Sequence, residues 1–412
     1  MENPKIRFKG FTKDWEQRKL GDLVDRVTRK NQDLVSELPL TISAQYGLID
    51  QNEFFDKRVA SKDVSGYYLI ENGEFAYNKS TSTDAPWGAI KRLDRYENGV
   101  LSTLYIVFGI KENNPVDSDF LVSYYSTNLW HKGIHEIAAE GARNHGLLNI
   151  APADFFETRL MIPQDIEEQK KIGKYFIELE ALITLHQRKC EQTKNLKKYM
   201  LQKMFPQNGA KVPEIRFNGF THDWEQRKLS DVLDIVTKRN GEKYGKEEVL
   251  SVSDEYGCIN QIKFQGRSFA GEDISNYKIV DTGDIIYTRS PLKSKPYGII
   301  KVVGDEIGIV SPLYIVNKVK EGNNSQFIYR VFDSPEKTNK YLSPLVRKGA
   351  KNTMNISNDE WLSGKIDVAP SYEEQYQIGL YFDHLDNLIT LHQRQCDELK
   401  KMKKYMLQNM FI

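Results

Sequence analysis

The chain has 412 residues, which is enough for two or three domains with their own hydrophobic cores. Its 58 Lys and Arg nearly balance its 57 Asp and Glu, so any nucleic-acid binding must depend on local clusters of charge. Three cysteines are too few for a disulfide framework and indicate a reducing cytoplasm. We expect neither a signal peptide nor a membrane span, because no apolar h-region follows the first charges and no run of about 18 apolar residues occurs.

Two segments of the chain occur twice. Residues 4–25 and 213–234 are identical at 16 of 22 positions with an offset of 209. Residues 167–205 and 373–411 are identical at 25 of 39 positions with an offset of 206. The segments between these repeats align only in outline. The sequence therefore predicts two similar units that share a scaffold and present different surfaces.

Each unit opens with an aromatic and basic segment, in which Asp14 and Asp223 are candidate helix caps. Short β-type runs follow at residues 73–77 and 104–108 in the first unit and at 284–287 and 313–316 in the second. Helical stretches are expected at 119–137 and 325–342. Because strands and helices do not alternate as regular βαβ units, we predict an α+β fold for each domain.

Each unit closes with a long helix that runs without proline as far as Pro206 in the first copy. Apolar residues step by four and three along it, which is the period of a coiled-coil seam. The predicted seam consists of Ile172, Phe176, Leu179, Ile183 and His186, and of Ile378, Phe382, Leu385, Ile389 and His392. About 37 helical residues span roughly 55 Å.

We expect the two helices to pair. If a pseudo-two-fold axis relates the units, the helices run antiparallel, with a domain at each end of the pair. The predicted boundaries are 1–165 for the first recognition domain, 166–206 for the central helix, 207–371 for the second domain and 372–412 for the C-terminal helix.

The sequence lacks recognisable catalytic motifs. It contains no phosphate-binding loop, no Gly-x-Gly-x-x-Gly segment after a strand, and no Asn-Pro-Pro-aromatic segment typical of amino-group methylation. The pairs His186 with Cys190 and His392 with Cys396 could converge as a zinc site. A seam histidine that sets the helix register and a cysteine acting as a small hydrophobe explain the same spacing, so we expect no metal.

Basic and polar residues recur at matching positions in the two divergent middle segments. Arg and Asn are the side chains that make bidentate bonds to guanine and adenine in the major groove. Taken singly, such clusters are usually solvated surface, but their repetition favours DNA binding. The predicted contacts are Arg29, Lys30, Tyr46, Lys79, Ser80, Arg143 and Asn144 in the first unit, and Lys238, Arg239, Tyr256, Arg289, Ser290, Lys351 and Asn352 in the second.

The chain resembles the specificity subunits of type I restriction–modification systems over essentially its whole length. The resemblance is carried by Asn149-Ile150 and Asn355-Ile356, an acidic–aromatic pair, a proline, and Glu-Glu-Gln at 167–169 and 373–375. The acidic–aromatic pairs are Asp154-Phe155 and Glu360-Trp361, and the prolines are Pro163 and Pro370. One departure is that the family's Ile-Pro with further prolines is abbreviated here to Ile162-Pro163 and Ala369-Pro370.

The resemblance implies a non-catalytic subunit that binds double-stranded DNA. Each domain would read one half of an asymmetric bipartite target, and the helix pair would set the gap, for which roughly 34 Å is one turn of DNA. The chain would recruit two methyltransferase (modification) subunits and restriction subunits, which would carry S-adenosylmethionine, ATP and Mg. Trp15, Trp224 and the exposed helix faces would form the docking surface, although simple core packing would explain the two tryptophans equally well. Two alternatives are a free-standing tandem DNA-binding regulator and a coiled-coil scaffold without a DNA role.

Overall fold

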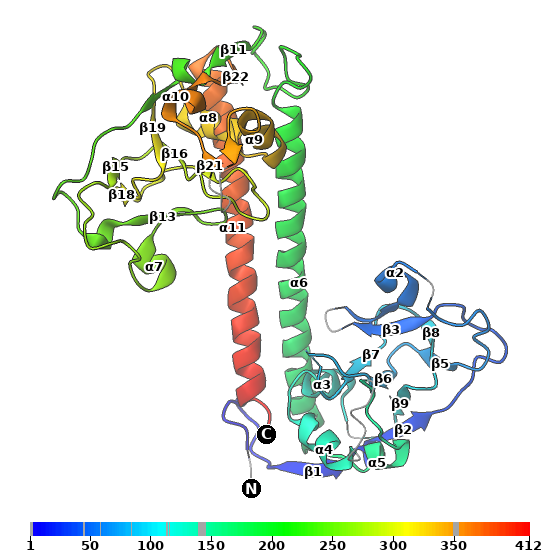
Figure 1. Cartoon of the computed structure of the whole chain (residues 1–412). Helices are drawn as coiled ribbons and strands as arrows, with labels where there is room; N and C mark the ends of the chain where they lie inside the picture. The colour runs from blue at the N-terminus through cyan, green and yellow to red at the C-terminus, as the bar shows by residue number, and fades with distance from the viewer. Residues whose placement is uncertain are drawn as a thin grey trace. The chain divides into compact units, whose positions relative to one another are not determined.

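The computed structural model describes residues 3–43, 46–57, 59–83, 85–112, 114, 116–138, 146–348 and 354–412. The chain forms two compact units, Met1–His186 with Arg394–Ile412, and Gln187–Gln393. Each unit therefore contains one domain and a part of both long helices. The two termini lie close together in the first unit, where the Ile6 amide donates to the Asn409 carbonyl over 2.9 Å (Figure 1).

The first unit is built on an antiparallel four-stranded sheet of order β2-β9-β6-β7. Three two-stranded sheets accompany it, β1-β10, β3-β4 and β5-β8. The strands are β1 (Trp15–Lys19), β2 (Val24–Val27), β3 (Leu40–Ser43), β4 (Gly47–Asp50), β5 (Tyr68–Glu71), β6 (Phe75–Asn78), β7 (Ala89–Arg92), β8 (Asn98–Leu101), β9 (Ile106–Ile110) and β10 (Arg159–Pro163). The helices are α1 (Leu20–Leu23), α2 (Gln51–Phe55), α3 (Ser118–Tyr124), α4 (Trp130–Ile137), α5 (Pro152–Phe156) and α6 (Ile166–Lys203).

The second unit repeats this topology. Its four-stranded sheet has the order β12-β19-β16-β17, and its pairs are β11-β22, β13-β14, β15-β18 and β20-β21. The strands are β11 (Glu225–Lys228), β12 (Leu233–Ile235), β13 (Leu250–Ser253), β14 (Gly257–Asn260), β15 (Lys278–Val280), β16 (Ile285–Tyr287), β17 (Ile300–Val302), β18 (Gly308–Val310), β19 (Ile315–Val319), β20 (Arg347–Lys348), β21 (Met354–Asn355) and β22 (Lys365–Val368). The helices are η1 (Leu229–Asp231), η2 (Lys246–Glu248), α7 (Gln261–Gln265), α8 (Ser325–Val331), α9 (Pro335–Leu342), α10 (Asn358–Ser363) and α11 (Tyr372–Asn409). The predicted α+β fold is confirmed.

The predicted strands overlap β6, β9, β16 and β19. The two predicted helical stretches are confirmed, each with a break, whereas the two predicted helix caps are wrong. Each of the stretches 119–137 and 325–342 forms two short helices instead of one, and Pro335 begins the second of them in the second unit. Asp14 and Asp223 cap no helix, because the residues after them form β1 and β11, which pair with β10 and β22.

The two long helices run antiparallel within each unit. In the first unit, Lys403 of α11 forms an ion pair with Glu180 of α6. In the second unit, Lys197 of α6 lies 2.7 Å from Asp386 of α11. In the same unit Cys190 Sγ of α6 lies 3.7 Å from the side chain of Gln393 of α11, so the contact on α11 moves back from residue 393 to residue 386 as α6 runs from residue 190 to residue 197. The seam positions that are fully buried are Ile172, Phe176, Leu179, Ile183, Ile378, Phe382 and Leu385, whereas Ile389, His186 and His392 are half-buried.

The repeated segments attach each domain to the helices. Arg7 donates from Nε and Nη2 to the Glu168 carboxylate over 2.6 and 2.8 Å, and Glu168 is fully buried. Arg216 binds Glu374 in the same way over 2.7 and 2.9 Å. Buried carboxylates require such charged, bidentate partners. The glutamates are the second residues of the Glu-Glu-Gln motifs, so the motif holds the start of each unit against its helix.

Trp15 and Trp224 belong to the same attachment. Both are 4% exposed and pack in the hydrophobic cores of their units. The Trp224 Nε1–H donates to Glu374 over 3.1 Å. Their predicted role in docking a partner is therefore wrong. Among the described residues, no helix is long and apolar enough to cross a membrane.

Candidate nucleic-acid interface

Each domain has a loop at the end of an inner strand of its four-stranded sheet. The described residues of these loops are 79–83 and 85–87 after β6, and 289–297 after β16. A buried tyrosine closes each loop. The Tyr77 hydroxyl donates to the Trp87 carbonyl over 2.9 Å, and the Tyr287 hydroxyl donates to the Tyr297 carbonyl over 2.8 Å. Burial raises the pKa of both tyrosines, which keeps them protonated as donors. We call these segments the recognition loops.

A glycine is required where each recognition loop returns to the sheet. Gly88 has φ +78° and Gly298 has φ +94°, a region that favours glycine. A Cβ on Gly88 would lie 2.2 Å from the Asn78 carbonyl oxygen, and one on Gly298 would lie 3.1 Å from Cε2 of Tyr287. A tyrosine and a glycine at equivalent positions thus fix the backbone at both ends of each loop, while the side chains within the two loops differ.

The loops begin at the predicted contacts Lys79 with Ser80 and Arg289 with Ser290. In the first unit this start pairs with residues 146–148, since Ser80 bridges Leu147 and the Leu148 amide donates to the Lys79 carbonyl over 2.9 Å. In the second unit, Arg289 donates to the Ile356 carbonyl over 3.3 Å. A groove of about 370 Å³ lies there, lined by Arg289, Arg347, Met354, Asn355, Ile356, Ser357 and Glu360.

The predicted contacts Arg143, Asn144, Lys351 and Asn352 lie outside the described residues. The chain that follows them is described and lies beside the recognition loops, as residues 146–148 and 354–356 do. The described residues that follow the two undescribed segments therefore contact the first residues of the recognition loops.

The basic residues that follow β2 make contacts within the first domain. Arg29 faces Glu74 at 2.9 Å and Glu71 at 3.4 Å, so its charge is neutralised within the domain. Lys30 donates to the Gly66 carbonyl over 2.9 Å and lies 3.9 Å above the Tyr68 ring. The neighbouring Asn31 is fully buried and exchanges hydrogen bonds with the Ser36 backbone. The recurrence of this asparagine in both units, as Asn31 and Asn240, thus has a structural cause.

The second unit keeps the cluster with different partners. Arg239 donates to the Asn276 carbonyl over 3.1 Å, in the position that Lys30 has in the first unit. Asn240 holds the Tyr244 backbone as Asn31 holds Ser36. Lys238 is exposed. Arg239 also faces Lys278, a residue that we had not predicted, through an isolated antiparallel bridge.

Tyr46 and Tyr256 lie at equivalent turns of the β3-β4 and β13-β14 hairpins and are 61% and 57% exposed. Each backbone amide donates to a serine hydroxyl, Ser43 or Ser253, over 3.2 Å. In the second unit Asp254 of this turn lies 2.5 Å from Lys295 of the recognition loop. An ion pair thus joins the hairpin turn to the recognition loop.

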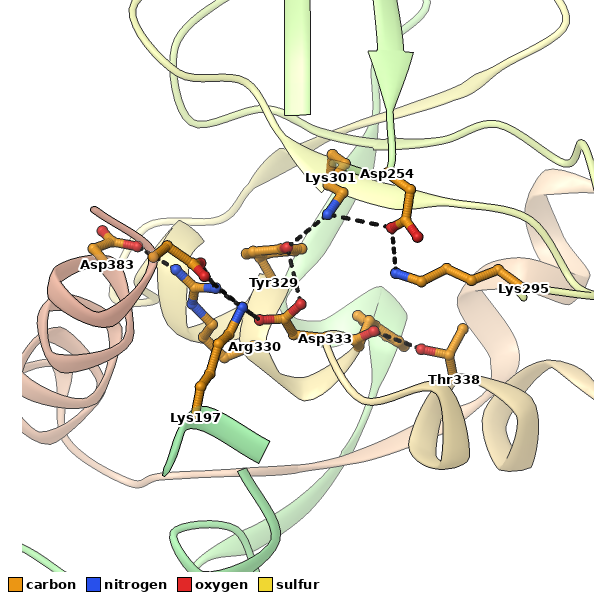
Figure 2. A network of polar contacts seen from close by, with 11 residues as sticks. Lys197, Asp254, Lys295, Lys301, Tyr329, Arg330, Asp333, Thr338 and Asp383 are labelled. Carbon is orange, nitrogen blue, oxygen red and sulfur yellow. Dashed lines mark hydrogen bonds and ion pairs between the residues drawn. The ribbon is translucent and has the colours of Figure 1, made fainter. Parts of the chain in front are cut away.

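A network of charges continues from this turn to the helices of the second unit (Figure 2). Asp254 also lies 3.6 Å from Lys301, whose Nζ contacts the Tyr329 hydroxyl at 3.2 Å. Tyr329 donates to Asp333, which pairs with Lys197 of α6 over 2.7 Å. Arg330 completes the network with ion pairs to Asp333, Asp383 and Asp386 of 2.7, 2.5 and 2.6 Å.

No group of three or more His, Cys, Asp and Glu side chains that could hold a metal ion occurs among the residues that the structure describes. Cys190 is buried with its Sγ 3.8 Å from the Ile389 carbonyl and 3.7 Å from the Gln393 side chain. Cys396 packs against Leu179 and Ile183 in the first unit. Both cysteines are core residues of the helix pair.

Comparison with known proteins gives a consistent picture. A family model described as the type I restriction modification DNA specificity domain matches residues 221–401. The specificity subunit of the type I restriction enzyme MjaVIII of Methanocaldococcus jannaschii is 23% identical over 406 residues, which cover 95% of this chain and 90% of the relative. The crystal structure of the S subunit of a type I restriction–modification system from M. genitalium superposes with a TM-score of 0.62 at 13% identity, covering 100% of this chain and 99% of that chain. The second comparison extends over both units and the third shows the same fold.

Proposed function

Because the chain belongs to the family of type I restriction–modification specificity subunits, we propose that each of its domains reads one half of an asymmetric bipartite DNA target. The long helices set the gap between the halves. The chain itself catalyses no reaction, and it acts on double-stranded DNA in the cytoplasm. The observation that carries this proposal is the pair of recognition loops, which share one frame and differ in their side chains.

The two recognition loops carry different side chains, which supports recognition of two different base sequences. The first loop begins with Lys79 and continues through small polar residues to Trp87, whereas the second begins with Arg289 and contains Lys293 and Lys295. Such loops at strand ends, held by a rigid sheet, are the usual place of binding residues. A shared frame with different side chains suits two half-sites of different sequence, because bases are read by side chains that approach their edges.

We further propose that two methyltransferase subunits dock on exposed apolar residues of the long helices. Leu182 and Leu185 of α6 are 46% and 42% exposed in the first unit. Leu388 and Leu391 of α11 are 44% and 48% exposed at the equivalent positions of the second unit. Exposed apolar patches of this kind commonly bind other proteins. Because the patch occurs once in each unit, it suits two identical partners, to which restriction subunits are then added.

This assignment leaves S-adenosylmethionine, ATP and Mg to the methyltransferase and restriction subunits. The present chain supplies DNA recognition and the surfaces on which these partners assemble.

The test is a genome-wide map of adenine methylation in a host that expresses the chain with its neighbouring methyltransferase. We expect a split motif that disappears when the chain is deleted. Arg143→Ala and Lys351→Ala should each relax one half of the motif, and not the same half. Unchanged methylation after deletion would contradict the proposal and favour a free-standing DNA-binding regulator, which would bind its site tightly without a methyltransferase.

A further inference from the structure

Three cations gather on one side of the second domain. Arg239 and Lys278 face each other in an antiparallel bridge, so their side chains leave the same face. Arg289 begins the recognition loop with φ +55°, a left-handed conformation that is uncommon for a residue other than glycine. The three residues come from the segment after β12, from the start of β15 and from the end of β16.

Backbone carbonyls hold these cations in place. Lys278 Nζ donates to the Tyr314 carbonyl over 2.6 Å, and Arg289 Nε donates to the adjacent Leu313 carbonyl over 2.8 Å. Arg239 Nη1 donates to the Asn276 carbonyl over 3.1 Å. Two of the cations are thus fixed on successive carbonyls of one turn. A carbonyl orients a cation but does not neutralise it.

The cluster lacks a counter-ion. Within the described ranges, neither Arg239, Lys278 nor Arg289 forms an ion pair with a carboxylate. Burial lowers the pKa of Lys278, and the charges of Arg289 and Arg239 lower it further. An anion placed among the three side chains would relieve this repulsion.

The first domain has a different cluster at the equivalent positions, Lys30, Tyr68 and Lys79. Tyr68 replaces the central lysine and is 8% exposed. Its ring lies under the Lys30 ammonium at 3.9 Å, and its hydroxyl lies 3.5 Å from Nη2 of Arg26. In the first domain Lys30 and Arg26 therefore contact an aromatic side chain, whereas the equivalent position in the second domain holds another cation, Lys278.

We propose that Arg239, Lys278 and Arg289 form a binding site for one phosphate of the DNA backbone, present in the second domain and absent from the first. This inference rests on the proposed function. Arginine and lysine beside one another bind phosphate diesters through charge-assisted hydrogen bonds. Such contacts fix the position of a protein on the duplex without reading sequence. The phosphate site anchors the second domain to the DNA backbone at its half-site.

The first experiment measures the DNA affinity of the complex of this chain with its methyltransferase as a function of salt concentration. Lys278→Met should reduce the slope of log affinity against log salt by about 0.9, the value for one phosphate contact. The ratio of wild-type to variant affinity should then change about threefold between 50 and 200 mM salt. The preference for bases in either half-site should not change. Lys263→Met is the matched control, because this lysine of the same domain already pairs with Glu306 at 2.7 Å, and its slope should equal that of the wild type.

A second measurement identifies the phosphate. Single methylphosphonate substitutions, which remove one backbone charge at a time, are placed across the second half-site. We expect one position that weakens wild-type binding and has no effect on Lys278→Met or Arg239→Gln. The two variants keep the inference testable if one of them folds poorly.

Three results would overturn the phosphate site. The first is an unchanged salt slope in both variants, and the second is a changed base preference, which would assign base reading to these residues. The third is a site that binds free anions but no DNA phosphate. In that case inorganic phosphate would raise the Tm of the wild type more than that of Lys278→Met, and no methylphosphonate position would weaken wild-type binding. A wild-type complex without any sequence preference would instead contradict the proposed function.

Discussion

At the scale of single residues, equivalent positions in the two units keep their geometry and change their charge balance. Glu74 in the first unit accepts the Glu71 amide over 2.7 Å and pairs with Arg29 at 2.9 Å. Asp284, its equivalent, accepts the Asp281 amide over 2.9 Å, is 5% exposed, and makes no ion pair among the described residues. The equivalent turns are therefore held by an ion-paired carboxylate, Glu74, in the first unit and by a buried carboxylate, Asp284, in the second.

Asp284 should make the stability of the second unit depend on pH. Burial raises the pKa of Asp284 to about 6, although the hydrogen bond from the Asp281 amide opposes the shift. Between about pH 4 and pH 6 the folded state keeps a proton that the unfolded chain has released, so stability falls as the pH rises through this window. The effect is at most about 3 kcal/mol, from about two pKa units at 1.36 kcal/mol each.

Asp284→Asn tests this dependence. Urea unfolding of the wild type and the variant should give free energies whose difference shifts in favour of the variant between pH 4 and pH 6 and is constant above pH 7. The wild-type hydrogen bond is kept, because an amide oxygen also accepts from Asp281. A difference that stays constant across the whole range would show that Asp284 is ionised throughout.

At the scale of elements, α8 of the second domain is joined to the long helices by ion pairs, whereas its equivalent α3 in the first domain has uncharged residues at the matching positions. Arg330 of α8 is 2% exposed and faces three carboxylates. Burial opposes its charge, but Asp333 and Asp386 outweigh burial and raise the pKa of Arg330. In the first domain the positions of Arg330 and Asp333 are occupied by Ser123 of α3 and by Ser126, which follows α3. The Ser123 hydroxyl donates only to the Asp119 carbonyl of its own helix over 2.8 Å.

Arg330→Met should therefore destabilise the second unit by about 3–5 kcal/mol, because it leaves Asp383 without its partner and leaves Lys197 as the one cation paired with both Asp333 and Asp386 within the described residues. Ser123→Ala at the equivalent position should cost about 1 kcal/mol or less. Denaturant unfolding, with hydrogen exchange at the α8 amides to assign the unit, measures both. Adding Asp383→Asn to Arg330→Met should recover part of the loss, since one unpaired carboxylate is removed. A similar small loss in both single variants would mean that the network contributes little.

The elements also show what the sequence could predict. The long helices and the presence of two similar units followed from the period of apolar residues and from the repeats. The strand β1 did not, because Asp14 before a mixed polar segment resembles a helix cap and its pairing with β10 connects residues about 145 positions apart. The break between α3 and α4 was missed for a similar reason. Tertiary packing decided these segments against their local preference.

The same limit applied to the candidate interface. Repetition of basic residues predicted Arg239 and Arg289, but Lys278 was invisible because its equivalent is Tyr68. The bridge between Arg239 and Lys278 and the adjacent carbonyls that hold Lys278 and Arg289 bring the three cations together. Conversely, the repetition of Asn31 and Asn240 reflects buried hydrogen bonds to loop backbones. A residue that recurs in both units thus indicates a shared structural role more reliably than a shared DNA contact. Binding residues that differ between the units can be identified only from the fold.

At the scale of the whole molecule, the proposed docking of methyltransferase subunits on the duplicated exposed leucines predicts that two such subunits bind. Leu185 and Leu391 occupy equivalent positions, one in each unit, and are 42% and 48% exposed. Burying one leucine side chain at an interface contributes about 1.5–3 kcal/mol, and a charge placed there costs more. Leu185→Asp and Leu391→Asp should each reduce the complex from two methyltransferase subunits to one at micromolar concentration, and the double variant should bind none. Native mass spectrometry counts the subunits directly.

Leu34→Asp, which alters a 51% exposed leucine outside the helices, is the control and should retain two. If either single variant lost both methyltransferases, the two patches would form one shared surface and the model of independent docking would fail, because two equivalent sites must be lost one at a time.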